Sequence, residues 1–153
     1  MEYFDKSETL DRGEIESLQA GRLAGSVKQA LKSPFYKQHL DGAAPGDIKK
    51  ADDVRALPFT TKDDLRASYP YGMVAEPLDK LVRLHASSGT TGSPTVVFHT
   101  QKDLDTWASL MARCMHMVGV RPGDILQNMS GYGLFTGGLG IHYGSEHLGC
   151  LTI

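Results

Sequence analysis

Residues 85–95, HASSGTTGSPT, constrain the fold more than any other stretch of the sequence. They are rich in serine, threonine and glycine, contain no aspartate, glutamate, lysine or arginine, and lie between two largely apolar runs, 81–85 and 95–99. Short runs of this kind, bounded by small polar residues, are typical of β-strands. The sequence therefore predicts two strands joined by a polar loop.

A strongly amphipathic helix is predicted directly after the second strand, over residues 101–118. Its apolar residues recur at helical spacing on one face. They are Leu104, Trp107, Ala108, Met111, Cys114, Met115 and Val118. We interpret this stripe as a core-facing surface rather than a ligand site.

The first part of the chain is predicted to be helical. Residues 11–40 carry apolar side chains at mostly three- to five-residue steps, with Ser33-Pro34 as the expected stop. A loop follows, and a shorter helix is expected to begin after Thr60 or Thr61 and to end at Pro70. We place a helical N-terminal region at residues 1–80.

Residues 81–153 are interpreted as the start of an α/β subdomain. A probable strand lies near residue 125, the glycine-rich stretch GYGLFTGGLGIHYGSEHLG leads into a closely packed helix, and residues 150–153 begin another strand. Alternating strands and helices indicate an α/β fold. Because the last strand has no room for its neighbour, we expect an incomplete domain and a chain that is cut short, and the bare strand edge would favour self-association, for example as a homodimer.

Composition excludes several other classes of protein. The formal net charge of −2 over 153 residues gives no basic surface for nucleic acid or an anionic membrane. Cys114 and Cys150 are widely separated, so we expect buried free thiols rather than a disulfide framework or a zinc site. The acidic N-terminus lacks an apolar signal segment, which favours the cytoplasm.

The polar loop suits an anionic oxygen ligand. Backbone N–H groups of a glycine-rich turn can converge on one concavity, and short hydroxyl side chains add donors. The spacing does not fit a Walker A loop, which needs GxxxxGK[ST] before a helix, and Gly131, Gly133 and Gly137 do not fit a dinucleotide turn. A plain polar hairpin turn remains the alternative.

The segment SSGTTGSPT resembles the phosphate-binding loop of the adenylate-forming enzymes. More narrowly, LQAGRL, SPFYKQHL, LPFTTKDDLRASYP, RLHASSGTTGSPTVV and GYGLFTGGLGIHYGSEHLG resemble, in order, the phenylacetate-CoA ligases, and coenzyme F390 synthetase shares much of the pattern. The resemblance implies the N-terminal part of an enzyme that joins an aryl acid to ATP as an acyl adenylate, and then transfers the acyl group to coenzyme A.

The resemblance also implies which residues bind the nucleotide, ATP with Mg²⁺. They are Ser87, Ser88, Gly89, Thr90, Thr91, Gly92, Ser93 and Thr95. Ser93 departs from the family pattern, because relatives often carry lysine at this position. Without the lysine one charge-assisted contact is lost, which puts the affinity for phosphate in doubt more than the ability to bind it. The magnesium ligands, the adenylation lysine and other catalytic groups are expected beyond Ile153.

An apolar slot for the aryl group is expected in the glycine-rich stretch. Tyr132 and Phe135 can form its walls, while Gly137 and Gly138 leave space for a planar ring. Glycine-mediated helix packing, with the aromatic residues in the core, is the alternative.

The histidines give no metal motif. The spacing HxxxEH, formed by His142, Glu146 and His147, is one residue too long for the zinc pattern HxxEH and differs from the zinc pattern HExxH. His85 and His99 flank the loop and are interpreted as structural, with contact to a phosphate or to the substrate carboxylate as the alternative. The chain alone is expected to be inactive or nearly so, and a non-catalytic truncated product with weak or no nucleotide binding is the competing hypothesis.

Overall fold

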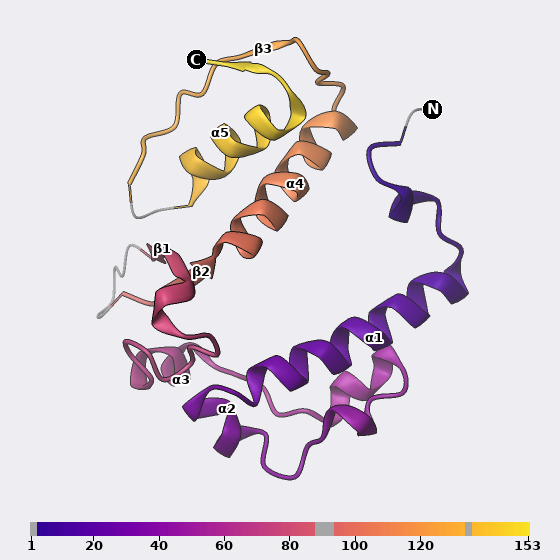
Figure 1. Ribbon diagram of the computed structural model, residues 1–153, viewed down its shortest axis with the longest axis vertical. Helices are drawn as coiled ribbons and strands as arrows, with labels where there is room; N and C mark the ends of the chain where they lie inside the picture. The colour runs from indigo at the N-terminus through magenta and orange to yellow at the C-terminus, as the bar shows by residue number, and fades with distance from the viewer. Residues whose placement is uncertain (1–2, 88–93, 134–135) are drawn as a thin grey trace. The chain divides into compact units, whose positions relative to one another are not determined.

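The computed structural model describes residues 3–87, 94–133 and 136–153 of the chain (Figure 1). These residues form two compact units. One unit is Lys6–Leu78, and the other combines Met1–Asp5 with Asp79–Ile153.

The unit Lys6–Leu78 is built around α1 (Arg12–Ala30). Asp11 caps this helix, since its carboxylate accepts a 2.8 Å hydrogen bond from the Glu14 N–H, and Glu14 in turn accepts one from the Asp11 N–H at 2.9 Å. This reciprocal pair satisfies two N–H groups that the first turn leaves without helical partners. The helix then runs unbroken through Gly21 and Gly25.

A second helix begins where the sequence predicts a stop. α2 (Pro34–His39) has Pro34 in its first turn, and the buried Ser33 caps it by accepting a 3.2 Å hydrogen bond from the Tyr36 N–H. Proline is favoured in a first turn because its missing N–H has no helical partner there. The expected stop is confirmed, since α1 ends three residues before this pair, but the pair also starts α2, which was not predicted from the sequence.

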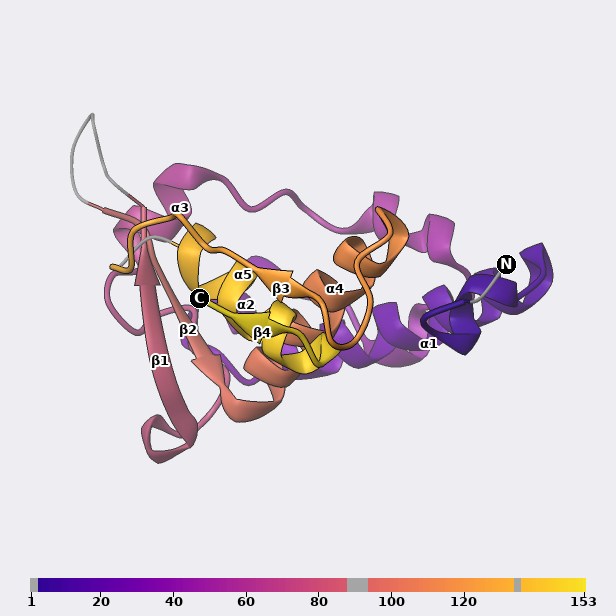
Figure 2. The same cartoon turned by 90° about the horizontal axis from the view of Figure 1, so that it is seen from above.

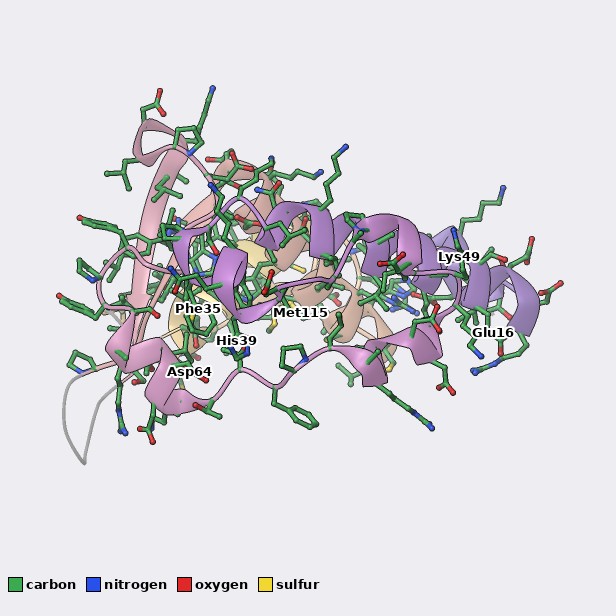
Figure 3. The ribbon with its side chains drawn as sticks, turned by 90° about the horizontal axis from the view of Figure 1, so that it is seen from below. Glu16, Phe35, His39, Lys49, Asp64 and Met115 are labelled. Atoms are coloured by element: carbon green, nitrogen blue, oxygen red, sulfur yellow. The ribbon has the colours of Figure 1, made fainter. Side chains whose placement is uncertain are left out.

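The predicted helix after Thr61 is confirmed as α3 (Lys62–Ala67). Thr61 and Asp64 cap its first turn reciprocally, and hydrogen bonds from the Thr61 hydroxyl and N–H lower the pKa of the Asp64 carboxyl. Figure 3 shows Asp64 near His39 and Phe35, whose rings stack with centroids 4.6 Å apart. The short helices of this unit are η1 (Lys6–Thr9), η2 (Pro45–Asp47) and η3 (Ala51–Ala56).

The two predicted strands are confirmed in the other unit. The short helix η4 (Leu78–Lys80) leads into β1 (Leu81–Ala86), which pairs antiparallel with β2 (Val96–Thr100) (Figure 2). In this register His85 lies opposite Val97, and Arg83 lies opposite His99. The two ends of the serine-threonine-glycine loop are thus held by adjacent strands.

The predicted amphipathic helix is also confirmed, as α4 (Gln101–Met117). It follows β2 without a break because Thr100 caps it: the Thr100 hydroxyl accepts from the Asp103 N–H at 3.3 Å, and Asp103 accepts from the Thr100 N–H at 2.8 Å. The core around this helix contains Ala112, Met115 and Leu148.

Two residues of the predicted apolar stripe do not lie in the core. Cys114 is exposed, contrary to the expected buried thiol, and Val118 is 76% exposed; Cys150 is half-buried. The core-facing side of α4 is narrower than the stripe, because it is covered mainly by one helix.

That helix is α5 (Gly137–Leu148), which lies alongside α4 in Figures 1 and 2. Two glycines one turn apart permit a very close approach. A Cβ atom on Gly140 would lie 2.6 Å from the Trp107 ring, and one on Gly144 would lie 2.5 Å from Met111 Cβ. Both distances are shorter than van der Waals contact, so α4 and α5 pack together only because these side chains are absent.

The final strand has a neighbour, contrary to the prediction. β4 (Leu151–Thr152) pairs in parallel with β3 (Ile125–Leu126), and α5 connects them. The exposed side chains of this small sheet are apolar: Ile125, Leu151 and Ile153 are 68%, 59% and 65% exposed. The expected mixture of helix and strand is confirmed, as two separate two-stranded sheets. Within the described residues, no helix has the length and apolar character needed to cross a membrane.

The glycine contact predicts opposite effects for two matched substitutions. Gly144→Ala gains helix propensity, but its Cβ would overlap Met111 Cβ, so we expect a net loss of about 1–2 kcal/mol in the free energy of unfolding. Gly21→Ala in α1, where nothing lies within 4 Å, should instead gain up to about 1 kcal/mol. Urea unfolding followed by circular dichroism measures both, and stabilisation by Gly144→Ala would contradict this packing.

Candidate functional site

The neck of the serine-threonine-glycine loop is closed by hydrogen bonds between Ser87 and Thr95. The Ser87 N–H donates to the Thr95 carbonyl oxygen at 2.9 Å, the Thr95 N–H donates to Ser87 Oγ at 3.2 Å, and the two hydroxyls bond each other at 2.8 Å. Both residues are half-buried. The other predicted nucleotide-binding residues, 88–93, lie outside the described residues.

These hydrogen bonds give Ser87 and Thr95 a structural task. One of their two hydroxyl protons is used in the bond between them, so the pair can offer at most one hydroxyl donor to a ligand. Any further donors to an anion would have to come from elsewhere in the loop. That either residue touches a nucleotide stays a prediction.

Two histidines and a tryptophan lie at the base of the hairpin. His85 on β1 is only 3% exposed, and its ring meets those of His99 and Trp107 edge-on, with centroids 5.1 and 5.3 Å away. The His99 and Trp107 rings stack at 6.2 Å with an angle of 18° between their planes. The hairpin therefore rests on α4 through aromatic contacts.

Burial lowers the pKa of His99. Positive charge on His85 and Arg83 would act in the same direction, while the carboxylate of Asp103 opposes it. Within the described part of the chain, the buried Nε2 atom of His99 has no hydrogen-bond partner. A neutral imidazole tolerates this position better than a cation, because burial penalises the charged form.

Arg83 connects the hairpin to α5. Its guanidinium carbon lies 4.6 Å from the centroid of the Tyr143 ring, which is a cation–π distance. Nη1 of Arg83 is buried, and among the described residues it has no hydrogen-bond partner. The same face of β1 thus carries Arg83 toward α5 and His85 toward α4.

The predicted aryl slot is described only in part. Tyr132 is 58% exposed, and its hydroxyl lies 3.0 Å from His142 Nδ1. Asn128 Nδ2 donates to the Tyr132 hydroxyl at 3.1 Å and to the Gly138 carbonyl oxygen at 2.9 Å, so one amide orients both. Phe135 lies outside the described residues.

The two slot glycines lie at the start of α5. Gly137 is its half-buried first residue, and Gly138 is buried. A Cβ atom on Gly138 would lie 2.6 Å from the Gly131 carbonyl oxygen, so backbone already occupies the space beside it. Close packing therefore accounts for Gly138, and a ring-binding role for either glycine stays a prediction.

The sequence left some of these contacts unassigned. Arg83 and His85 are two residues apart in a predicted strand, a spacing that places both on one face. Nothing in the sequence indicated that Asn128 would orient Tyr132. Among residues 3–87, 94–133 and 136–153, no group of three or more His, Cys, Asp and Glu side chains is placed to hold a metal ion.

Comparison with known proteins shows close relatives along nearly the whole chain. Phenylacetate-coenzyme A ligase of Aromatoleum evansii is 50% identical over 149 residues, covering 95% of this chain and 34% of the ligase. The Escherichia coli (strain K12) ligase of the same name is 47% identical over 152 residues, covering 97% of this chain and 35% of the ligase. The chain thus spans about a third of the length of these relatives. No protein-family model matches it.

Solved structures show the same relationship at the level of the fold. Crystal structures of 2-hydroxyisobutyryl-CoA ligase in complex with 2-HIB-AMP and CoA match the chain with TM-scores of 0.86 in the thioesterification state and 0.85 in an open conformation. They are 30% and 28% identical, and each match covers 95% of this chain but only 32% and 35% of the ligase. Over nearly its whole length the chain is therefore similar to a portion of the phenylacetate-CoA ligases that spans about a third of their length.

Proposed function

We propose that the chain is part of an AMP-forming aryl-acid CoA ligase of the phenylacetate type. In the first step the acid's carboxylate attacks the α-phosphorus of ATP, which gives an acyl adenylate and pyrophosphate. In the second, the thiol of coenzyme A displaces AMP and forms the thioester. The observation that carries this proposal is the 46–50% identity to phenylacetate-CoA ligases over at least 95% of the chain.

The contribution of this chain would be to bind the triphosphate. Negative charge grows on the departing pyrophosphate during adenylation, and donors fixed in advance around it stabilise that charge. The closed neck at Ser87 and Thr95 supports this role, because it fixes both ends of the loop. The described residues do not fit a magnesium site, so we assign no step to that ion.

We further infer where the acid binds, how the chain is divided and where in the cell the protein lies. An aryl acid would lie against Tyr132 and Phe135, with Gly137 and Gly138 beside it. Residues 1–80 would form a helical region and residues 81–153 the beginning of the AMP-binding subdomain. We also infer that the protein is cytoplasmic.

The phosphate role predicts opposite effects at two loop positions. In a protein of the relatives' full length that contains this sequence, Ser93→Lys adds a charge-assisted contact and should tighten ATP binding up to about tenfold. Thr91→Val removes a hydroxyl and should weaken ATP binding about three- to tenfold. Isothermal titration calorimetry with ATP measures both. Thr106→Val, on an exposed position of α4, is the matched control and should change nothing. Equal affinities in all four proteins would reduce the loop to a hairpin turn.

The acid slot predicts a selective kinetic defect. The 153-residue chain alone should form no detectable acyl-CoA from an aryl acid, ATP and coenzyme A, because it lacks an identified adenylation lysine. In a protein of the relatives' full length that contains this sequence, Phe135→Ala should raise KM for the acid and spare KM for ATP. Robust turnover by the chain alone, or an effect confined to ATP, would contradict the assignment.

The exposed apolar sheet predicts self-association. Ile125 is 68% exposed on β3, and a lysine there would oppose contact between copies. We expect sedimentation velocity to show a concentration-dependent dimer that Ile125→Lys abolishes. Val82→Lys, which replaces another exposed apolar residue of the same unit, should leave it intact. A wild-type monomer at all concentrations would exclude a homodimer.

A further inference from the structure

The aromatic cluster at the base of the hairpin consists of His85, His99 and Trp107, and it brings together β1, β2 and α4. His85 and His99 lie on adjacent strands, and both rings contact the indole on α4. Trp107 is in turn held by α5, since Gly140 admits its ring. The cluster therefore fixes the hairpin to both helices of its unit.

The cluster also lies close to the neck along each strand. His85 is two residues before Ser87, and the Ala86↔Val96 pair separates the cluster from the neck. His99 is four residues after Thr95 on the partner strand. If either strand shifted against α4, the hydrogen bonds between Ser87 and Thr95 would be displaced as well. No turn or bulge between Arg83 and the neck could absorb such a shift.

The charged groups around His99 make its protonation unfavourable. On β1, Arg83 lies directly opposite and is already a cation, and His85 is buried at its side. On α4, Asp103 attracts a positive charge, and the stacked face of Trp107 offers a further weak attraction. The balance favours the neutral ring, since the pKa of His99 is lowered chiefly by burial.

We propose that His99 is a positioning residue whose neutral imidazole, stacked on Trp107 and edge-on to His85, holds the neck of the loop in its closed geometry. Protonating His99 places a second cation beside Arg83 and drives the hairpin away from α4. The hydrogen bonds between Ser87 and Thr95 then break, and the neck opens. The importance of this for nucleotide binding rests on the proposed function, but the geometry of the neck does not.

The direction of the pH dependence follows from the lowered pKa. The unfolded chain takes up the proton at the ordinary histidine value of 6.5, before folded His99 does. Stability contributed by this residue is therefore complete at neutral pH, is lost progressively as the pH falls below 6.5, and reaches its limit below the folded pKa.

Trp107 and Ser87 supply two direct readouts. Trp107 is the chain's one tryptophan, so its fluorescence reports on the cluster alone. Amide hydrogen exchange of Ser87, measured by NMR and expressed as a protection factor, reports on the Ser87 N–H to Thr95 bond. We would measure both from about pH 7.5 to about pH 5, across the range in which histidine titrates.

Two variants and a control separate the outcomes. His99→Phe keeps an aromatic ring on Trp107 but cannot be protonated. His99→Gln cannot be protonated either, and it replaces His99→Phe if the larger phenyl ring does not fit. His147→Gln removes an exposed histidine of α5 and serves as the control. In the wild type and the control we expect a fluorescence transition on the acid side of pH 6.5, together with a fall in the Ser87 protection factor.

In the His99 variants both acid changes should disappear. Persistence of the transition in His99→Phe or His99→Gln would overturn the inference, as would a fluorescence transition with Ser87 protection unchanged. Neither readout requires ATP. If the wild type shows both changes but binds no ATP, the positioning role stands and the proposed function fails.

Discussion

Packing around Trp107 holds together the unit that carries the loop. The indole meets the bare backbone of Gly140 on one helix and two imidazoles on the hairpin. A single large side chain on α4 thus contacts both strands of the hairpin and α5. Aromatic rings suit this position because they bury a large area with few rotatable bonds.

The local structure of this unit could be predicted from sequence more completely than its packing. Apolar runs indicated both strands, and Thr100 with Asp103 explains why α4 starts directly after β2. Periodicity alone could not show that Cys114 is exposed, because the width of the buried face depends on how closely α5 approaches. Likewise, the proline at position 34 is compatible with either the end or the start of a helix, and only the cap at Ser33 decides between them.

The candidate site shows the same limit. The sequence indicated that Ser87 and Thr95 flank a loop, but strand register decides that their hydroxyls bond each other. It also decides that Arg83 lies opposite His99, which brings two basic side chains together. Composition gives no signal for such a pairing. Tyr132 was singled out as an aromatic wall, yet the position of its hydroxyl is set by Asn128 and His142.

A hairpin base of histidine, arginine and tryptophan stabilises the fold less than an aliphatic base would. Buried nitrogen atoms without partners, on Arg83 and His99 in the described structure, lower stability compared with apolar side chains of similar volume. Aliphatic residues would hold the strands equally well at every pH. The contacts of aromatic rings and of a guanidinium group depend on orientation, whereas the contacts of methyl groups do not. The polar base is therefore consistent with a hairpin whose orientation matters more for its role than its stability does. The cation–π contact of Arg83 with Tyr143 and the edge-on contact of His85 with Trp107 set the hairpin's angle to two helices at once.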